Sequence, residues 1–212
     1  MSAMTMEVQG EGHDIFVHPA AQLAGARLRV KGSGCSVQIG PGVSGKWDLT
    51  VSQGGRLVIG AGTTCESAVV VAQSTHVLIG SDCMLSFSIE IRTTDTHAIY
   101  DVETGERVNP DRPVEIGDHV WLGKQSVVLK GTTIGSGSIV GTRAVASATL
   151  PPLSLSAGVP ARLLREGVTW TRHIGPGELQ ADADAMAVLT TARMSAGLPP
   201  QPRPVVRQRP AE

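Results

Sequence analysis

Aliphatic residues recur at every sixth position in the second half of this chain, with small residues between them. From Ile116 to Val140 the series is unbroken, and glycine follows four of its five members. A period of six fits neither an amphipathic helix nor a simple alternating strand, so the pattern predicts short strands joined by tight corners. The aliphatic series is Ile116, Leu122, Val128, Ile134 and Val140, and the small or branched residues four places later are Val120, Ser126, Thr132, Ser138 and Ala144.

Three such strands per coil, each paired with its counterpart in the next coil, make a three-sided parallel β-prism. Branched aliphatic side chains point inward, and glycine or small residues fit the corners, where a side chain would crowd the turn. The narrow interior agrees with an aromatic content of only 3%. Parallel crossovers are nearly always right-handed, and the period of six does not by itself indicate the opposite hand.

The first half of the chain carries a looser form of the same repeat. Ile39, Ile59 and Ile79 each precede a glycine and lie twenty residues apart. Each coil here therefore has eighteen residues plus a small bulge, and the prism begins by about Leu28. Residues 1–26 show no such phase, so we expect them to form a cap over the end of the stack.

A long interruption separates the two halves of the repeat. The strict step reaches His97 and restarts at Ile116, nineteen residues later. The segment 97–115 must leave the prism and return close to its starting point, and its Gly105 and Asn109 favour turns. We expect a protruding loop, and a long loop inside a regular solenoid usually carries function.

After Val145 the repeat fades into a proline-containing segment that ends strand pairing. The composition of 177–197 predicts one amphipathic helix, and the proline-rich tail beyond it is expected to be disordered. The domain organisation expected is a cap at 1–26, a prism domain at 27–168, and a C-terminal helix with its tail at 169–212.

Composition and charge exclude several classes of function. The net charge is −1, from 18 basic and 19 acidic residues, which argues against nucleic acid as the main partner. No apolar run is long enough for a membrane span, and the N-terminus lacks the basic start and apolar core of a signal peptide, so a cytoplasmic protein is expected. The three cysteines are widely spaced without a CxxC pair, so small wall residues are expected at Cys35, Cys65 and Cys83.

His97 differs from the other five histidines, which we interpret as surface or structurally satisfied residues. It stands where the loop leaves the prism, two residues after Asp95. A neutral imidazole can accept a proton from a hydroxyl near neutral pH, and a nearby carboxylate can fix its tautomer. The spacing alone leaves a catalytic and a structural role equally open.

Two further groups of residues have alternative interpretations. Trp121 lies beside a corner, where its ring could stack on a neighbouring subunit or form a flat wall for an acyl or pantetheine chain. Arg162 and Arg165, with Lys130 and Arg143 earlier in the chain, could be a solvated basic face or a clamp for the phosphates of CoA.

Three segments resemble the hexapeptide-repeat O-acetyltransferases, which transfer an acetyl group from acetyl-CoA to a hydroxyl. They are DTH at 95–97, VEIGDHVWLG at 114–123, and IGSGSIVG through SAGVPARLLRE at 134–166. The loop sequence and the VTWTR segment near the C-terminus are most similar to the polysaccharide and sialic-acid O-acetyltransferases. The resemblance implies an all-β, left-handed parallel β-helix with a protruding loop and a C-terminal helix.

The resemblance also implies roles for individual residues. His97 corresponds to the general base and Trp121, twenty-four residues later, to the tryptophan that lines the acetyl-donor site. Asp95 is expected to orient the site, and the backbone N–H of Lys124 to lie near the thioester oxygen. The positions matching cofactor contacts are Trp121, Lys124, Thr142, Ser147, Ala148, Arg162 and Arg165.

The match has departures that bear on the cofactor. Thr142 and Arg143 replace the usual Ala-Gly, and Ala148 stands where many members have lysine. We therefore expect altered or weaker recognition of the adenosine and phosphate groups. The positions that contact the acceptor in the galactoside enzymes are Ser67 and Thr75 here, so the acceptor does not carry over.

The function expected is acetyl-CoA-dependent O-acetylation of a sugar hydroxyl on a glycan or its precursor. Acetyl-CoA is the co-substrate, a carbohydrate is the acceptor, no metal is expected, and the active sites lie between the subunits of a homotrimer. One alternative is a non-catalytic scaffold, which the departures at Thr142, Arg143 and Ala148 keep open. The other is a γ-type carbonic anhydrase, which needs three histidines around one zinc ion.

Overall fold

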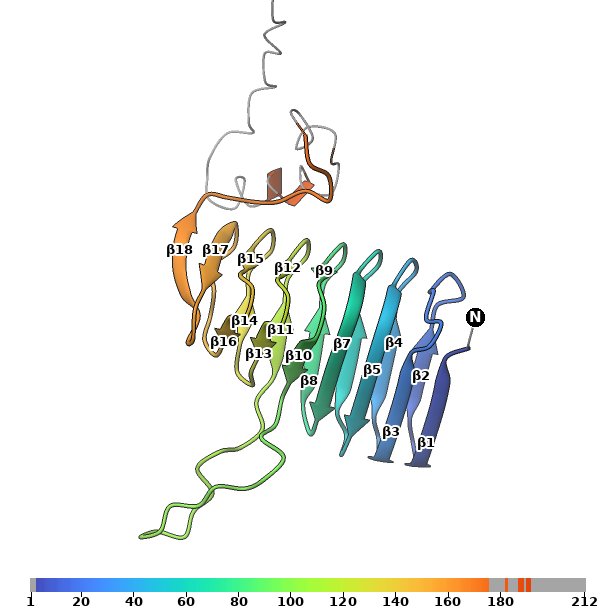
Figure 1. Cartoon of the computed structure of the whole chain (residues 1–212). Helices are drawn as coiled ribbons and strands as arrows, with labels where there is room; N and C mark the ends of the chain where they lie inside the picture. The colour runs from blue at the N-terminus through green and yellow to red at the C-terminus, as the bar shows by residue number, and fades with distance from the viewer. Residues whose placement is uncertain (1–2, 176–181, 183–186, 189, 192–212) are drawn as a thin grey trace, which may run out of the picture.

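Parallel strands stack along one axis through almost the whole described chain (Figure 1). The structure is a computed structural model that describes residues 3–175, 182, 187–188 and 190–191. The all-β solenoid predicted from the period of six is thus confirmed. In chain order the strands are β1 (Thr5–Glu11), β2 (Asp14–Val17), β3 (Arg27–Ser33), β4 (Ser36–Ile39), β5 (Ser44–Ser52), β6 (Arg56–Ile59), β7 (Thr64–Gln73), β8 (His76–Ile79), β9 (Met84–Leu85), β10 (Ile89–Arg92), β11 (Val114–Ile116), β12 (Trp121–Leu122), β13 (Val127–Val128), β14 (Thr133–Ile134), β15 (Ile139–Val140), β16 (Val145–Ala146), β17 (Ser154–Ala157) and β18 (Arg162–Glu166).

The strands form three faces. One face is a separate sheet in the order β14-β11-β8-β6-β4-β2. The other two belong to one larger sheet, because the long strand β7 pairs with β9 near its start and with β10 further along. Past β7 this sheet divides into the run β9, β12, β15 and β17 and the run β10, β13 and β16.

The repeating aliphatic residues fill the interior. Ile116 is 3% exposed, Leu122, Val128 and Val140 are 0% exposed, and Ile134 is 1% exposed. Each such side chain contributes about 1.5–3 kcal/mol by leaving water. The stack of coils therefore depends on a continuous aliphatic column along the axis.

The three cysteines are buried and free, as their spacing predicts. Burial raises the pKa of the Cys65 and Cys83 thiols to about 12. Both remain protonated at neutral pH and act as small apolar wall residues.

The two ends of the prism differ. The described part of the expected cap carries β1 and β2, which pair in parallel with β3 and β4 and so cover the end with one more coil. At the other end β17 and β18 form an antiparallel pair. The C-terminal helix expected at 177–197 lies outside the described residues, apart from a few isolated positions. Among the described residues, no helix is long and apolar enough to cross a membrane.

The loop leaves the prism after β10 and returns at β11. Figure 1 shows it projecting well away from the coils. An antiparallel bridge between Tyr100 and Arg107 joins its two sides. Its base therefore lies where two faces of the prism meet, beside the turns of the neighbouring coils.

Candidate active site

The base of the loop is held by a lysine and an asparagine that contact both of its ends. Lys130 Nζ lies 2.5 Å from Asp95 Oδ2 and donates to the backbone oxygen of Asn109 at 3.1 Å. The Nδ2 of Asn109 donates to Asp95 Oδ2 and to the backbone oxygen of His97, at 2.8 Å each. The segment before the loop and the segment after it are thus joined through three side chains.

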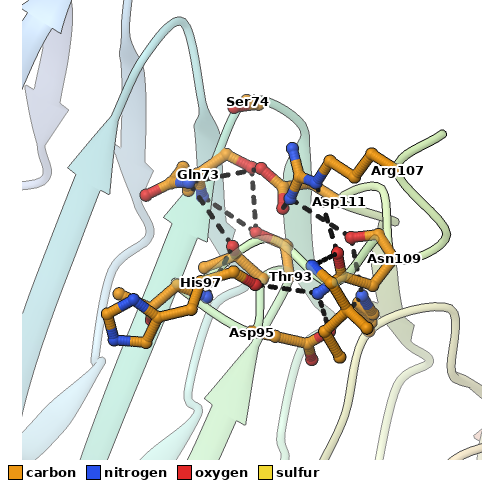
Figure 2. A network of polar contacts seen from close by, with 12 residues as sticks. Gln73, Ser74, Thr93, Asp95, His97, Arg107, Asn109 and Asp111 are labelled. Atoms are coloured by element: carbon orange, nitrogen blue, oxygen red, sulfur yellow. Dashed lines mark hydrogen bonds and ion pairs between the residues drawn. The ribbon is translucent and has the colours of Figure 1, made fainter. Parts of the chain in front are cut away.

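His97 is placed by its backbone, while its ring is left free. The residue is exposed, and its imidazole forms no hydrogen bond with any described residue. Figure 2 shows the ring pointing away from the polar network that surrounds its backbone. Its nitrogens are therefore available to a ligand.

A second layer of contacts supports this arrangement. The backbone N–H of Gln73 donates to Thr93 Oγ1 at 2.8 Å, and Gln73 Nε2 donates to Asp111 Oδ2 at 3.3 Å. Arg107 donates to Asn109 Oδ1 at 3.3 Å and pairs with Asp111 at 3.4 Å (Figure 2). The loop base is thereby connected to β7 on the preceding coil.

Two carboxylates of the network stay charged well below neutral pH. Hydrogen bonds from Lys130 and Asn109 lower the pKa of Asp95. Burial alone would raise the pKa of Asp111, but hydrogen bonds from Thr94 and Gln73 outweigh it and the pKa is lowered. Asp95 is therefore a fixed negative charge two residues from His97.

Trp121, Lys124 and Thr142 lie along one edge of the prism, which we call the first corner, formed by turns 123–126 and 141–144. Trp121 is in β12, which pairs with β15, and its side chain is 37% exposed. The next turn places Lys124 beside Arg143, whose backbone N–H donates to the Lys124 oxygen at 2.8 Å. Within the described chain the backbone N–H of Lys124 has no acceptor.

Ser147 and Ala148 lie on a different edge, the second corner, formed by 93–97, 129–132 and 147–149. The pairing of β10 with β13 and of β13 with β16 stacks these three segments in successive coils. Both residues are exposed, and they lie in the same stack as Lys130 and His97. Arg162 and Arg165 are exposed on β18.

A single chain thus divides the predicted site residues between separate edges. The run of strands that holds Trp121 and the run that leads to His97 are different faces of the prism. One copy of the chain therefore carries the residues of both edges, but it does not bring the two edges together.

Comparison with known proteins finds proteins similar to this chain. The model of the bacterial transferase hexapeptide family, described as six repeats, matches residues 113–146. The polysialic acid O-acetyltransferase of Neisseria meningitidis is 33% identical over 132 residues, which is 61% of each chain. The crystal structure of the polysialic acid O-acetyltransferase OatWY matches with a TM-score of 0.76 at 29% identity, over 84% of this chain and 97% of that one. The chain therefore resembles hexapeptide-repeat acetyltransferases in sequence and in fold.

Two further proteins show the same similarity. The polysialic acid O-acetyltransferase of Escherichia coli is 27% identical over 60% of this chain. The crystal structure of NeuO, a polysialic-acid-specific acetyltransferase, shares the fold with a TM-score of 0.82 at 23% identity, over 91% of this chain and 95% of that one. The chain spans 61% and 42% of the length of the two polysialic acid O-acetyltransferases with which its sequence aligns.

Reasoning from the sequence missed the residues that hold the loop base. We interpreted Lys130 as part of a solvated face or of a phosphate clamp, whereas its side chain is 17% exposed and pairs with Asp95. Asn109 was expected only to favour a turn, yet it is 7% exposed and bonds both ends of the loop. The register of the repeat could have placed Lys130 at the loop base, because the period of six puts it one coil away from Thr93.

The zinc alternative gains no support from the arrangement of ligands. Among the described residues, the group of side chains that could surround a metal is Asp82, His119 and Asp182, and His97 is not part of it. Asp82 and His119 are bonded to each other at 2.6 Å, and Asp82 also pairs with Arg172.

Proposed function

We propose that this protein is an acetyl-CoA-dependent O-acetyltransferase that acts on a sugar hydroxyl of a glycan, with His97 as the general base. The observation that carries the proposal is the free imidazole of His97, held by its backbone at the edge of a prism whose loop base is fixed by Asp95, Asn109 and Lys130. The acetyl transfer named for the relatives needs a base with this freedom. Because acetyl-CoA is an intracellular metabolite, we place the reaction in the cytoplasm.

The proposed reaction needs one proton acceptor and one oxyanion donor. His97 takes the proton of the sugar hydroxyl while that oxygen attacks the thioester carbonyl. The backbone N–H of Lys124, which has no acceptor within the described chain, stabilises the oxyanion. The C–S bond then breaks, and the imidazolium of His97 returns its proton to the departing thiolate.

The proposed site is completed by a second copy of the chain. The second corner of one prism, with Asp95, His97, Ser147 and Ala148, faces the first corner of its neighbour, with Trp121, Lys124 and Thr142. A closed homotrimer of left-handed prisms satisfies this requirement with three equal sites, and the loop of each subunit folds over the next. Arg162 and Arg165 extend the donor site toward the phosphates of CoA.

The charges around one groove favour an acidic acceptor. A groove of about 660 Å³ crosses β3, β5, β7 and β10 on the same face as the strands leading to His97. Its lining residues Asp48 and Glu90 are paired with Arg29 and Arg92. Its two cations, Arg27 and Lys46, have no ion pair within the described chain, so they remain available to carboxylates of a glycan such as the polysialic acid of the relatives.

The test is CoA thiol release with a panel of glycan acceptors. Replacing His97→Ala should lower kcat about 10²- to 10⁴-fold, because general base catalysis contributes that factor. His18→Gln, which changes a histidine of the first coil, is the matched control and should keep full activity. Transfer that survives His97→Ala unchanged would contradict the mechanism.

A non-catalytic scaffold is the second candidate, favoured by Thr142, Arg143 and Ala148 at positions matching cofactor contacts. Calorimetric titration with acetyl-CoA separates the two functions. The enzyme is expected to bind acetyl-CoA and release CoA in the presence of acceptor, whereas a scaffold would do neither with any glycan.

A further inference from the structure

A short segment after β18 returns to the prism and is clamped there. We call Val168–Arg172 the strap. Its first residue donates its backbone N–H to Leu153 at 2.9 Å, and Trp170 is only 6% exposed. Figure 1 shows the orange chain that leaves β18 turning back across the ends of the coils. The strap therefore packs on turns that precede it by many residues in sequence.

The strap contacts the prism at a buried histidine whose ring faces two hydrogen-bond acceptors. His119 is 0% exposed. Its Nδ1 lies 2.6 Å from Asp82 Oδ2, and its Nε2 lies 2.9 Å from the backbone oxygen of Trp170. A carboxylate and a carbonyl can only accept, so the ring must donate from both nitrogens and is an imidazolium.

Side chains of the strap also donate hydrogen bonds to the prism. Trp170 Nε1 donates to the backbone oxygen of His119 at 2.9 Å, and the two rings stack with centroids 4.2 Å apart and 7° between their planes. Arg172 donates to Asp82 Oδ1 at 2.8 and 3.0 Å and to Thr64 Oγ1 at 3.0 Å. Asp82 is therefore shared between a histidine of the prism and an arginine of the strap.

The electrostatics agree with a charged ring. Burial alone would lower the pKa of His119, but the hydrogen bonds to Asp82 and to the Trp170 carbonyl outweigh it, and Asp182 adds to the shift, so the pKa is raised. Asp118, the preceding residue, accepts a hydrogen bond from the Ser81 backbone at 2.7 Å. The groups facing the ring are thus two carboxylates, one carbonyl and the guanidinium that neutralises part of Asp82.

The strap also contacts the proposed donor site. The ring of Trp170 lies 6.2 Å from that of Trp121, tilted by 50°, a separation within the range of aromatic contact. Trp121 follows His119 by two residues. One side of the Trp121 ring is therefore supported by the strap, and the rest is open to a ligand.

We propose that Trp170 is a positioning residue for Trp121 and that the imidazolium of His119 locks it in place. The inference rests on the proposed function, in which Trp121 lines the acetyl-donor site. When His119 loses its proton, either Asp82 or the Trp170 carbonyl loses its donor, and the strap is held less tightly.

The sign of the pH effect follows from the direction of the shift. A histidine whose pKa is raised on folding stabilises the lock fully below its ordinary value of about 6.5, and this contribution is lost as pH rises through the higher value in the folded protein. The KM for acetyl-CoA is therefore expected to rise on the alkaline side.

The kinetic test compares three variants of the full-length protein. Trp170→Ala should raise the KM for acetyl-CoA about tenfold, remove its alkaline rise, and leave kcat and the KM for the acceptor within about twofold. Trp170→Phe keeps a stacking ring without the Nε1–H and should have an intermediate KM. His173→Gln changes an exposed histidine beside the strap and should behave as wild type.

An NMR titration of the histidine ring nitrogens tests the lock without any activity measurement. His119 should keep protons on both nitrogens above the ordinary histidine value of about 6.5, and Trp170→Ala should move the titration of His119 toward lower pH. Titration of His119 at or below the ordinary histidine value of about 6.5, or an equal loss for both substrates in Trp170→Ala, would overturn the proposal. Failure of the proposed function would appear separately, as activity that survives His97→Ala.

Discussion

At the scale of single residues, Lys130 has contacts that reach beyond its own coil. Its ammonium group contacts Asp95 before the loop and Asn109 after it. Hydrogen bonds to a charged group contribute about 1.5–3 kcal/mol, and more is lost when a partly buried partner is left unsatisfied. The position of the His97 backbone therefore depends on a cation that need not touch substrate.

Replacing Lys130→Met should lower kcat about tenfold and destabilise the fold by about 2 kcal/mol, because Asp95 and the Asn109 carbonyl both lose their donor. The KM for acetyl-CoA should change little. Steady-state kinetics and thermal unfolding measure the two effects. Lys31→Met is the control, since Lys31 is exposed and its pair with Glu7 at 3.8 Å contributes little. Equal effects of the two substitutions would contradict this role for Lys130.

Residue chemistry could be predicted from the sequence only where the repeat fixes the environment. The inward aliphatics and the three cysteines were predicted correctly because the period of six decides which residues are buried. His119 was expected to be a surface or satisfied residue, and it is satisfied. Its partners Trp170 and Arg172 come from a segment outside the repeat, so no spacing rule connects them to it.

At the scale of the coil, glycine controls how closely successive turns stack. Gly45 has φ of +116°, and a Cβ at this position would lie 1.8 Å from the backbone oxygen of Cys65 in the next coil. This backbone conformation is nearly restricted to glycine, and the contact leaves no room for a methyl group. The bulge between Gly45 and Trp47 also lets β5 bend around a corner, which lengthens the coil beyond eighteen residues.

Gly45→Ala should destabilise the protein by about 3 kcal/mol, from backbone strain and the clash with Cys65 combined. Gly34→Ala is the matched control, because Gly34 also has positive φ, at +64°, but nothing lies within 4 Å of an added Cβ. Gly34→Ala should lower the free energy of unfolding by about 1 kcal/mol. Urea denaturation followed by circular dichroism measures both, and equal midpoints would show that coil stacking does not limit this position.

The elements themselves were predictable to the extent that they repeat. The strict period of six predicted the strands from β11 to β16, and the break in this period predicted the position of the loop. The parallel pairing of β1 with β3 was not expected, because residues 1–26 carry no hexad phase. Pairing through backbone hydrogen bonds needs no particular side chain, and the exposed β1 therefore leaves little pattern in the sequence.

At the scale of the whole molecule, the two corners are separate, so neither contains all the residues proposed for the site. His97 and Trp121 belong to different faces of one prism. If the reaction needs both, they must come from different copies, so each copy contributes to two sites. Activity should then depend on the pairing of subunits.

Subunit mixing tests this arrangement. Co-expression of His97→Ala with Trp121→Ala should restore activity to about a quarter of the wild-type value, because that share of randomly mixed interfaces has both native residues. Size-exclusion chromatography with light scattering should show a trimer for the mixture. Co-expression of His97→Ala with the double variant supplies no native His97 and is the control. A mixture as inactive as its components would contradict the shared site.

The open-ended stacking of coils has a consequence for how such a protein diverges. The groove crosses β3, β5, β7 and β10, so its length is set by how many coils precede the loop. Strands stack about 4.8 Å apart, and duplication of one coil in the gene would lengthen the groove by that step. His97 and Trp121 both follow the groove in sequence, so such a duplication would leave their relative geometry unchanged. If the groove binds the proposed glycan, its length and the geometry of the proposed catalytic residues can thus evolve independently.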